Sequence, residues 1–220
     1  MIVTIDGPAG TGKSTAARSV AQAVGFEYLD TGAMYRVVAL LALEAGVEVT
    51  SAADLSQITQ RASISFDSGR TLTAGRDVSA LIRTLEVTEA ASLVAQHPEV
   101  RDALVQEQRR FAGTRDIVCE GRDQGTVVFP HAECKFFLTA DARIRTQRRL
   151  QELDAQNKPT DFDSLLQQIE ERDRRDAERA IAPLRPAEDA LVLDTGPLSP
   201  EDVVEQMVAI IRERQAQSGP

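Results

Sequence analysis

The sequence contains few of the residues that build metal sites, disulfides and imidazole-based catalytic centres. Only two cysteines and two histidines occur in 220 residues, and Cys119 and Cys134 are isolated from any Cys-x-x-Cys spacing. We therefore expect neither a disulfide nor a structural metal site, and we interpret both cysteines as small buried side chains in a reduced cytosol. The scarcity of histidine also fits a reaction that needs no Ser-His pair to activate a nucleophile.

Basic charge is scarce as well. The chain has 25 Lys and Arg against 34 Asp and Glu, a formal net charge of −9, and a sequence pI of about 4.9. This balance argues against non-specific binding to nucleic acid or to an anionic membrane, because both need a basic surface. Without a charged leader or a long apolar run, we expect no signal peptide, no membrane span and a cytoplasmic location. The length and the hydrophobic share of 42% predict one domain with inserted subdomains.

A glycine-rich loop near the start of the chain carries the strongest functional signal. It fits Gly-x-x-x-x-Gly-Lys-[Ser/Thr], the phosphate-binding loop, and consists of Gly7, Pro8, Ala9, Gly10, Thr11, Gly12, Lys13, Ser14 and Thr15. The β-branched run at residues 2–5 predicts a strand before the loop, and apolar residues at helical spacing up to Gly25 predict a helix after it. In this order the loop N–H groups and the helix N-terminus point at a phosphate. Lys13 then lies near the β- and γ-phosphates, and the Ser14 hydroxyl is placed to ligate Mg²⁺.

Strands and helices alternate along most of the remaining chain. We expect strands at residues 26–30, 116–120, 135–139 and 191–195, and helices at 33–45, 53–59, 86–95, 100–112, from 141 through 149, 165–178 and from 199 onward. A hairpin at 63–66 and 70–73, continued by a turn and strand at 74–79, interrupts this order and indicates an inserted subdomain. A polar break at 156–160 separates two charged helices. The alternation predicts an α/β fold whose ligands bind beyond the carboxyl ends of the strands.

Arginines occur where such a fold would bind anions. Arg36 follows the second strand, Arg122 follows the strand at 116–120, and the helix after residue 141 carries Arg143, Arg145, Arg148 and Arg149. Bridging two anionic nucleotides requires cations from separate segments, because one loop cannot neutralise both the transferring phosphoryl group and an acceptor phosphate. An acceptor phosphate is already an anionic nucleophile, so the enzyme must supply position and charge rather than a base. The distribution predicts a small phosphotransferase.

Taken together, the motifs resemble those of the bacterial cytidylate (CMP/dCMP) kinases along nearly the whole chain. The matching motifs are Ile5-Asp-Gly-Pro-Ala-Gly-Thr-Gly-Lys-Ser-Thr15, Leu29-Asp-Thr-Gly-Ala-Met-Tyr-Arg36, Asp77-Val-Ser79, Ile82-Arg-Thr84, Ala91-Ser92, Val100-Arg101, Gly121-Arg-Asp-Gln-Gly-Thr-Val-Val-Phe-Pro130, Lys135-Phe-Phe-Leu138, Glu171-Arg-Asp-Arg-Arg-Asp176 and Arg179-Ala-Ile-Ala-Pro-Leu184. The resemblance implies an α/β P-loop nucleoside-monophosphate kinase fold, a parallel β-sheet core flanked by helices, with a monophosphate-binding insert and a helical lid. It implies one kinase domain, 1–220, with these approximate subregions: a core at 1–30, 105–147 and 177–220, a monophosphate-binding region at 31–104 with a β insert near 63–79, and a lid at 148–176.

The resemblance also implies roles for individual residues. Thr31, Arg36 and Arg122 would bind the CMP phosphate; Ser92, Arg101 and Asp123 would read the cytosine; Arg172 and Asp176 would hold the ribose; and Arg179 would act between base and phosphates. The catalytic cations would be Lys13, Arg122 and Arg179, with the lid arginines Arg148 and Arg149 closing over the transferring group. The spacing of 172, 176 and 179 places these residues on one helix face, although a solvated salt-bridge ladder gives the same spacing. His131 and Gln124 depart from the acidic and aliphatic residues usual in the family, and Gln124 adjoins Asp123.

The implied reaction is transfer of the γ-phosphoryl group of ATP, with Mg²⁺, to CMP or dCMP. Alternatives are a P-loop kinase for UMP, AMP or shikimate, and a non-catalytic nucleotide-binding regulator. A GTPase is disfavoured because the nearest match to its guanine-reading motif, Asn157-Lys158-Pro159-Thr160, lacks the aspartate. Asp30 is either an outer-shell group for Mg²⁺ or a helix N-cap. We expect a monomer whose partners are its small-molecule substrates.

Overall fold

The computed structural model describes residues 1–67, 69–155 and 158–217, and the chain within it divides into two compact units. Unit 1 comprises Met1–Leu29 and Ala112–Pro220, and unit 2 comprises Asp30–Phe111. Residue 68 of the predicted hairpin turn, and Gln156 and Asn157 of the predicted polar break, lie outside the described residues. The finer subregions predicted from the sequence stay a prediction.

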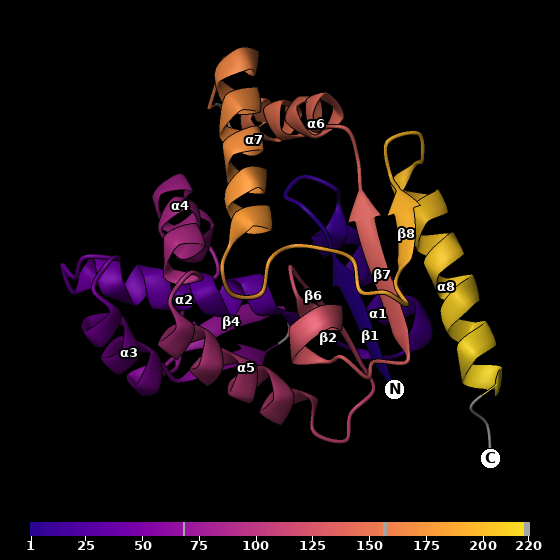
Figure 1. The fold of residues 1–220 in the computed structure, drawn as a ribbon, viewed down its shortest axis with the longest axis horizontal. Helices are drawn as coiled ribbons and strands as arrows, with labels where there is room; N and C mark the ends of the chain where they lie inside the picture. Colours follow the sequence, from indigo (N-terminus) through magenta and orange to yellow (C-terminus); the bar gives the residue numbers. More distant parts are fainter. Residues whose placement is uncertain (68, 156–157, 218–220) are drawn as a thin grey trace. The chain divides into compact units, whose positions relative to one another are not determined.

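Unit 1 is built on a five-stranded sheet in the order β2-β6-β1-β7-β8. The strands are β1 (Ile2–Asp6), β2 (Glu27–Asp30), β6 (Ile117–Gly121), β7 (Cys134–Thr139) and β8 (Leu191–Asp194). Strand β1 pairs in parallel with both β6 and β7, and β7 pairs in parallel with β8. Parallel strands bring their carboxyl ends to one edge of a sheet, so the segments that leave β1, β6 and β7 start at the same edge (Figure 1).

Two helices, α1 (Lys13–Val24) and α8 (Pro200–Gln217), pack on one face of this sheet. Their apolar residues form one core with alternate residues of β1, β6 and β7, including Val3 and Ile5 of β1. Because successive side chains of a strand point to opposite faces, Thr4 and Asp6 point to the other face. Gly25 ends α1 in the left-handed conformation, with φ of 76°, as expected for a helix stop.

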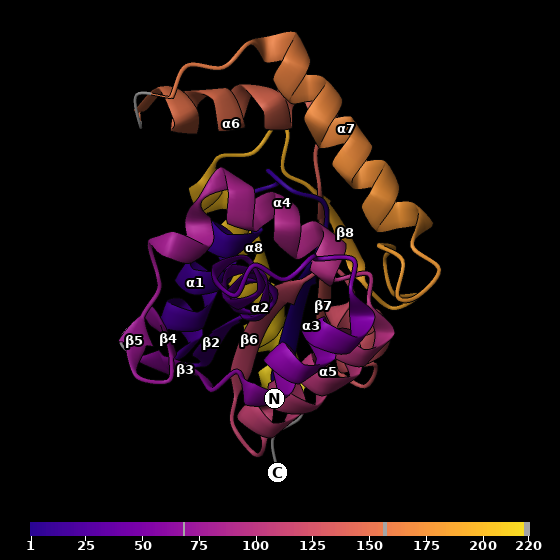
Figure 2. The same ribbon diagram turned by 90° about the vertical axis from the view of Figure 1, so that its left-hand side faces the viewer.

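Beyond the carboxyl end of β7, unit 1 continues into α6 (Ala142–Ala155) and α7 (Phe162–Glu178), which pack against each other (Figures 1 and 2). Asp161 caps α7 by accepting the Ser164 N–H at 2.9 Å. The helix ends at Glu178, where the chain turns back and the Leu184 N–H donates to the Asp176 carbonyl. The prediction that residue 179 shares a helix face with residues 172 and 176 is therefore wrong, since Arg179 follows the last helical residue.

Unit 2 consists of helices and a small antiparallel sheet. The helical elements are α2 (Thr31–Glu44), α3 (Ala52–Arg61), the 3₁₀ turn η1 (Leu81–Arg83), α4 (Leu85–Val94) and α5 (Pro98–Ala112), whose last residue falls in unit 1. The strands β3 (Ile64–Asp67), β4 (Arg70–Thr73) and β5 (Arg76–Asp77) form the sheet β3-β4-β5, which confirms the predicted hairpin and its third strand. Helix α2 packs against α3, α4 and η1.

One element of unit 1 was not predicted. Residues Gln124–Val128 form a π-helical turn, η2, in the segment between β6 and β7. A screen of the helices for length and apolarity finds none, over the described ranges, that could cross a bilayer. The 3₁₀ turn η1 of unit 2 was not predicted either, whereas the α/β class, the parallel sheet and the order of the remaining elements are as predicted.

Candidate active site

The glycine loop lies between β1 and α1, as the sequence predicted. Gly7, Gly10 and Gly12 have φ of 144°, 79° and 85°, values that favour glycine. A Cβ on Gly7 would lie 2.1 Å from the Leu138 carbonyl oxygen of β7, so no other residue fits there without moving the strand. Helix α1 then starts at Lys13, and its N-cap, Gly12, makes no side-chain capping bond to the first turn. The first N–H groups of α1 therefore form a site for an anion.

Lys13 is buried in unit 1 and folds back onto its own loop. Its ammonium donates to the Pro8 carbonyl at 2.6 Å and lies 3.5 Å from Thr11 Oγ1. Burial lowers the pKa of Lys13 well below its ordinary value, and the guanidinium of Arg122 lowers it further, against the opposing effect of Glu120. A bound triphosphate would reverse this shift, because it brings negative charge to a group whose ammonium form is otherwise disfavoured.

A second cation stands on the segment after β6. Arg122 Nε donates to Asp176 Oδ2 of α7 at 2.8 Å, and Nη1 donates to the Gly121 carbonyl at 3.2 Å. Burial acts to raise the pKa of Asp176, but the charge of Arg122 and the bond from it hold that pKa below its ordinary value, with Arg172 and Arg179 acting in the same direction. The structure thus brings four of the predicted residues of unit 1 together: Arg122, Arg172, Asp176 and Arg179.

Three of the four arginines of α6, namely Arg145, Arg148 and Arg149, have different surroundings. Arg145, to which the sequence assigned no role, is 5% exposed and binds three elements of unit 1. It donates to the Ala140 carbonyl at 2.9 Å, donates to the Ala9 carbonyl of the phosphate loop at 3.1 Å, and pairs with Asp173 of α7 at 2.6 Å. The sequence offered only its place in the arginine-rich helix as a signal.

The two predicted lid arginines differ from Arg145 and from each other. Arg148 donates to the carbonyl and the hydroxyl of Thr195, just after β8, at 2.6 and 3.1 Å. The buried Thr195 hydroxyl in turn donates to the Thr11 carbonyl at 3.1 Å, so Arg148 is linked to the phosphate loop. Arg149 instead pairs with Glu152, one turn later on the surface of α6. The catalytic role of either arginine stays a prediction.

In unit 2, the predicted phosphate-binding residues lie at the start of α2. Asp30 caps this helix by accepting the Ala33 N–H at 2.8 Å, which explains the residue without a metal. Arg36 Nη2 lies 3.1 and 3.0 Å from the two oxygens of the same carboxylate, and Arg83 lies 3.4 Å from one of them. The neighbouring Thr31 is buried. The Asp30 carboxylate therefore holds Arg36 in one orientation at the N-terminus of α2.

The predicted base-reading residues of unit 2 lie on α4 and α5. Arg101 is 3% exposed, donates to the Ala95 carbonyl that ends α4, and lies over the Tyr35 ring at 5.9 Å. Ser92 lies on α4 just before that end, and its buried hydroxyl has no hydrogen-bond partner within the described part of the chain. A buried polar atom without a partner is unfavourable, so this hydroxyl is suited to bind a polar ligand atom.

The sequence was compared with known proteins. The family model described as "Cytidylate kinase" matches residues 3–213. The chain belongs to the cytidylate kinase family. A cytidylate kinase from Vibrio cholerae is 46% identical over 217 residues, which are 97% of this chain and 96% of that protein, and one from Mannheimia succiniciproducens is 44% identical over 218 residues, 97% of each chain. A gluconokinase structure from Sinorhizobium meliloti has a TM-score of 0.50 at 15% identity and covers 99% of this chain and 97% of its own, which shows a shared fold alone.

This membership confirms the resemblance stated from the sequence. It also implies that Mg²⁺ binds together with the nucleotide. No group of three or more His, Cys, Asp or Glu that could hold a metal occurs within the described residues. That finding is compatible with a cytidylate kinase, because Mg²⁺ in nucleotide sites is held by substrate phosphates, waters and one or two protein oxygens. Ser14 fits this role, since it is exposed in the first turn of α1.

Proposed function

We propose that this chain transfers the γ-phosphoryl group of ATP to CMP or dCMP, giving ADP and CDP or dCDP. The observation that carries the proposal is the gathering of Lys13, Arg122, Arg172 and Asp176 next to the phosphate loop in a member of the cytidylate kinase family. The names of the relatives support the same reaction. ATP-dependent phosphorylation of CMP is therefore both the prediction from the sequence and the function that the site supports best.

The donor triphosphate binds the loop from Gly7 to Thr15. The N–H groups at the start of α1 hold its phosphates, and Lys13 moves from the Pro8 carbonyl to the transferring phosphoryl group. Mg²⁺, when bound with ATP, neutralises charge that builds up on the phosphate oxygens. The Ser14 hydroxyl would be the protein ligand that holds it.

The acceptor brings its own nucleophile, a phosphate oxygen that is anionic at neutral pH. Thr31 and Arg36 of unit 2 and Arg122 of unit 1 bind this phosphate, and Arg172 and Asp176 hold the ribose. Ser92, Arg101 and Asp123 read the cytosine, and Arg179 acts between base and phosphates. Arg148 and Arg149 of α6 close over the transferring group and exclude water, which otherwise competes as acceptor.

We also propose a monomeric, cytoplasmic enzyme. The two cysteines are free and buried, as expected in a reducing compartment. Sedimentation of the purified protein, with and without substrates, measures the oligomeric state directly.

An acceptor screen with Mg-ATP tests the reaction. We expect rapid phosphorylation of CMP and dCMP and much slower phosphorylation of UMP, AMP and shikimate. The reason is that a site built to hydrogen-bond the 4-amino edge of cytosine leaves buried groups unpaired with uracil, at a cost of about 1–3 kcal/mol for each unpaired group. A higher kcat/KM for AMP than for CMP would refute the proposal.

A further inference from the structure

The segment Gly121–Pro130 links β6 to β7 and has an unusual conformation. It carries two of the predicted acceptor-binding residues, Arg122 and Asp123. Its centre is the π-helical turn η2, in which the Val128 N–H donates to the Asp123 carbonyl at 3.2 Å and the Phe129 N–H donates to the Gln124 carbonyl at 2.7 Å. A single π-helical turn is rarely stable by itself. Contacts from outside the segment must therefore hold it in place.

The first of these contacts comes from Asp6, the last residue of β1. Its Oδ1 accepts the Gln124 N–H at 2.9 Å, and its Oδ2 accepts the Gly125 N–H at 2.8 Å. The side chain is buried, so both carboxylate oxygens are directed at the segment and not at solvent. Hydrogen bonds from backbone N–H groups to a buried carboxylate are stronger than bonds between neutral groups. They fix the residues that immediately follow Asp123.

Burying the ionised carboxylate of Asp6 opposes folding. Its pKa is raised to about 6, chiefly by burial and also by the nearby carboxylate of Asp123, while the two N–H bonds and Lys13 act in the opposite direction. A carboxylate in such surroundings contributes little to stability, which makes a positioning role the better explanation for its presence.

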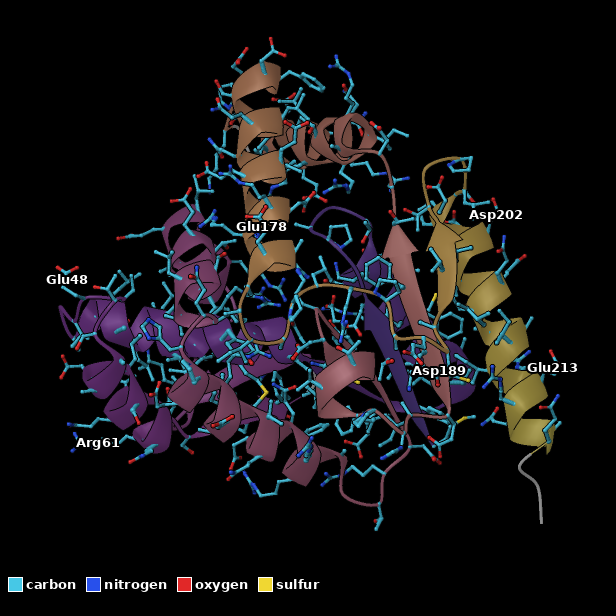
Figure 3. The ribbon with its side chains drawn as sticks, viewed as in Figure 1. Glu48, Arg61, Glu178, Asp189, Asp202 and Glu213 are labelled. Carbon is cyan, nitrogen blue, oxygen red and sulfur yellow. The ribbon has the colours of Figure 1, made fainter. Side chains whose placement is uncertain are left out.

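The second contact comes from Lys135 of β7. Its ammonium donates to the Pro130 carbonyl at 2.6 Å, at the other end of the segment, and to Asp189 at 2.9 Å. The Lys135 side chain is 6% exposed, whereas that of Asp189, labelled in Figure 3, is 65% exposed. Both bonds are partly buried, and only the bond to Pro130 reaches the segment Gly121–Pro130.

The segment also approaches the sheet closely in its middle. A Cβ on Gly125 would lie 2.9 Å from Thr4 Oγ1 and 3.2 Å from Lys135 Cδ. Thr4 and Lys135 are paired in register on neighbouring strands, and β1 is the central strand of the sheet. The stem of Lys135 therefore packs against the segment, and the two charged groups that hold the segment come from two neighbouring strands of the sheet, β1 and β7.

We propose that Asp6 and Lys135 are positioning residues for the acceptor nucleotide: the Asp6 carboxylate holds the middle of the segment Gly121–Pro130, the Lys135 ammonium holds its last residue, and together they fix Arg122 and Asp123 for binding. The proposal rests on the proposed function, since it concerns how the CMP-binding residues are held. It adds two residues that touch neither substrate.

The test measures steady-state kinetics with CMP and ATP for Asp6→Asn and Lys135→Met. Asparagine keeps the shape of Asp6 but can accept only one of the two N–H groups, and methionine keeps the stem of Lys135 but not its ammonium. We expect the KM for CMP to rise about tenfold or more in each variant, while the KM for ATP changes less than about twofold. A purely structural role would change both constants together or neither.

Matched control variants are available in unit 1. Asp202→Asn changes a carboxylate that accepts the Ser199 N–H at 3.2 Å at the start of α8 (Figure 3), and it should leave both KM values unchanged. Asp189→Asn removes the charge of the exposed partner of Lys135 and leaves the bond from Lys135 to Pro130, so it should change the KM for CMP less than about twofold. An effect of Asp189→Asn as large as that of Lys135→Met would overturn the role given to the Pro130 bond.

A double-variant cycle then asks whether Asp6 acts through Arg122. The Kd for CMP is measured by calorimetry for proteins with and without Asp6→Asn, both in the wild type and in the Arg122→Ala background. Binding is measured instead of turnover because Arg122→Ala is expected to turn over slowly. If Asp6 positions Arg122, Asp6→Asn should weaken CMP binding about tenfold in the wild type but less than about threefold in the Arg122→Ala background. Equal factors in the two backgrounds would overturn the inference.

Thermal unfolding of each preparation shows whether the variants are folded. If Asp6→Asn does not fold, Asp6→Ser, whose hydroxyl can still accept one N–H, takes its place in the same assays. Wild-type turnover of CMP is measured first. Its absence would contradict the proposed function, whereas wild-type activity with unchanged KM for CMP in the variants would contradict only the positioning role.

Discussion

Loss of the Arg145 guanidinium should destabilise the protein far more than loss of a surface arginine. Arg145→Met keeps the apolar stem of the side chain and removes its bonds to the Ala9 and Ala140 carbonyls and to Asp173. Hydrogen bonds of this charged kind contribute about 1.5–3 kcal/mol each when buried. The Asp173 side chain is 23% exposed, so water replaces part of what that carboxylate loses. We therefore expect the free energy of unfolding to fall by about 3 kcal/mol.

A second substitution separates the ion pair from the two carbonyl bonds. In Arg145→Met the Asp173 carboxylate is left without its cation, and its Oδ1 is already buried with no partner among the described residues. Asp173→Asn should therefore cost about 1–2 kcal/mol in the wild type but about zero in the Arg145→Met background, because it then removes a stranded charge. The coupling free energy between the two sites should be at least about 1 kcal/mol.

Urea unfolding at neutral pH measures all four proteins, with Arg110→Met as the surface control. The Arg110 side chain is 75% exposed and pairs only locally with Glu107, so its replacement should cost less than about 0.5 kcal/mol. Because Ala9 belongs to the phosphate loop, Arg145→Met should also raise the KM for ATP more than the KM for CMP. The reasoning would be refuted if Arg145→Met cost no more than Arg110→Met, or if Asp173→Asn cost the same in both backgrounds.

Four further predictions concern the site. Lys13→Ala should lower kcat by about two orders of magnitude or more without unfolding the protein, since one charge on the transferring group is lost; near-normal turnover would contradict its role. Because burial raises the pKa of Asp6 from 3.8 to about 6, the folded state binds its proton more tightly, and stability from this group is present below pH 4 and lost as pH rises through 6. The unfolding free energy of wild type minus that of Asp6→Asn should therefore fall by about 2 kcal/mol from pH 4 to pH 7, and a rise would contradict the shift. Arg36→Ala should weaken CMP and UMP equally, whereas Arg101→Ala should weaken CMP more by about 5- to 150-fold in kcat/KM; the reverse pattern would exchange the two roles. Hydrogen exchange in residues 148–163 should slow with a bisubstrate analogue, and equal exchange in both states would argue for a static element.

The sequence predicted the elements whose signals are local. The glycine loop, the stop at Gly25 and the hairpin of unit 2 depend on residues within a few positions of each other, and all three are present. The turn η2 was not predicted because it depends on the carboxylate of Asp6, which is 118 positions away from the N–H of Gln124. No window of neighbouring residues contains that information.

The same distinction applies to the site. Motif residues such as Lys13 and Arg122 could be found by type and spacing, but Asp176, the partner of Arg122, comes from another element, α7. Arg145 reaches Ala9 across 136 positions, and Thr195 reaches Thr11 across 184. The prediction that residue 179 lies on the same helix face was wrong for a local reason, because residues just after it end the helix. Pro183 follows closely, and the residue before it, Ala182, has a φ of 50°, which no helix continues.

Charge pairing explains how an acidic chain can carry a site for anions. Each of the cations Arg36, Arg122 and Arg145 has a carboxylate partner in its own unit, namely Asp30, Asp176 and Asp173. These partners hold the guanidinium groups in position before any substrate arrives, so binding loses little side-chain freedom. Lys13 differs, because its pKa is lowered by burial and by Arg122, and its nearest contacts are a carbonyl and a hydroxyl. A triphosphate bound at the loop would bring negative charge to Lys13 and raise its pKa back toward the ordinary value.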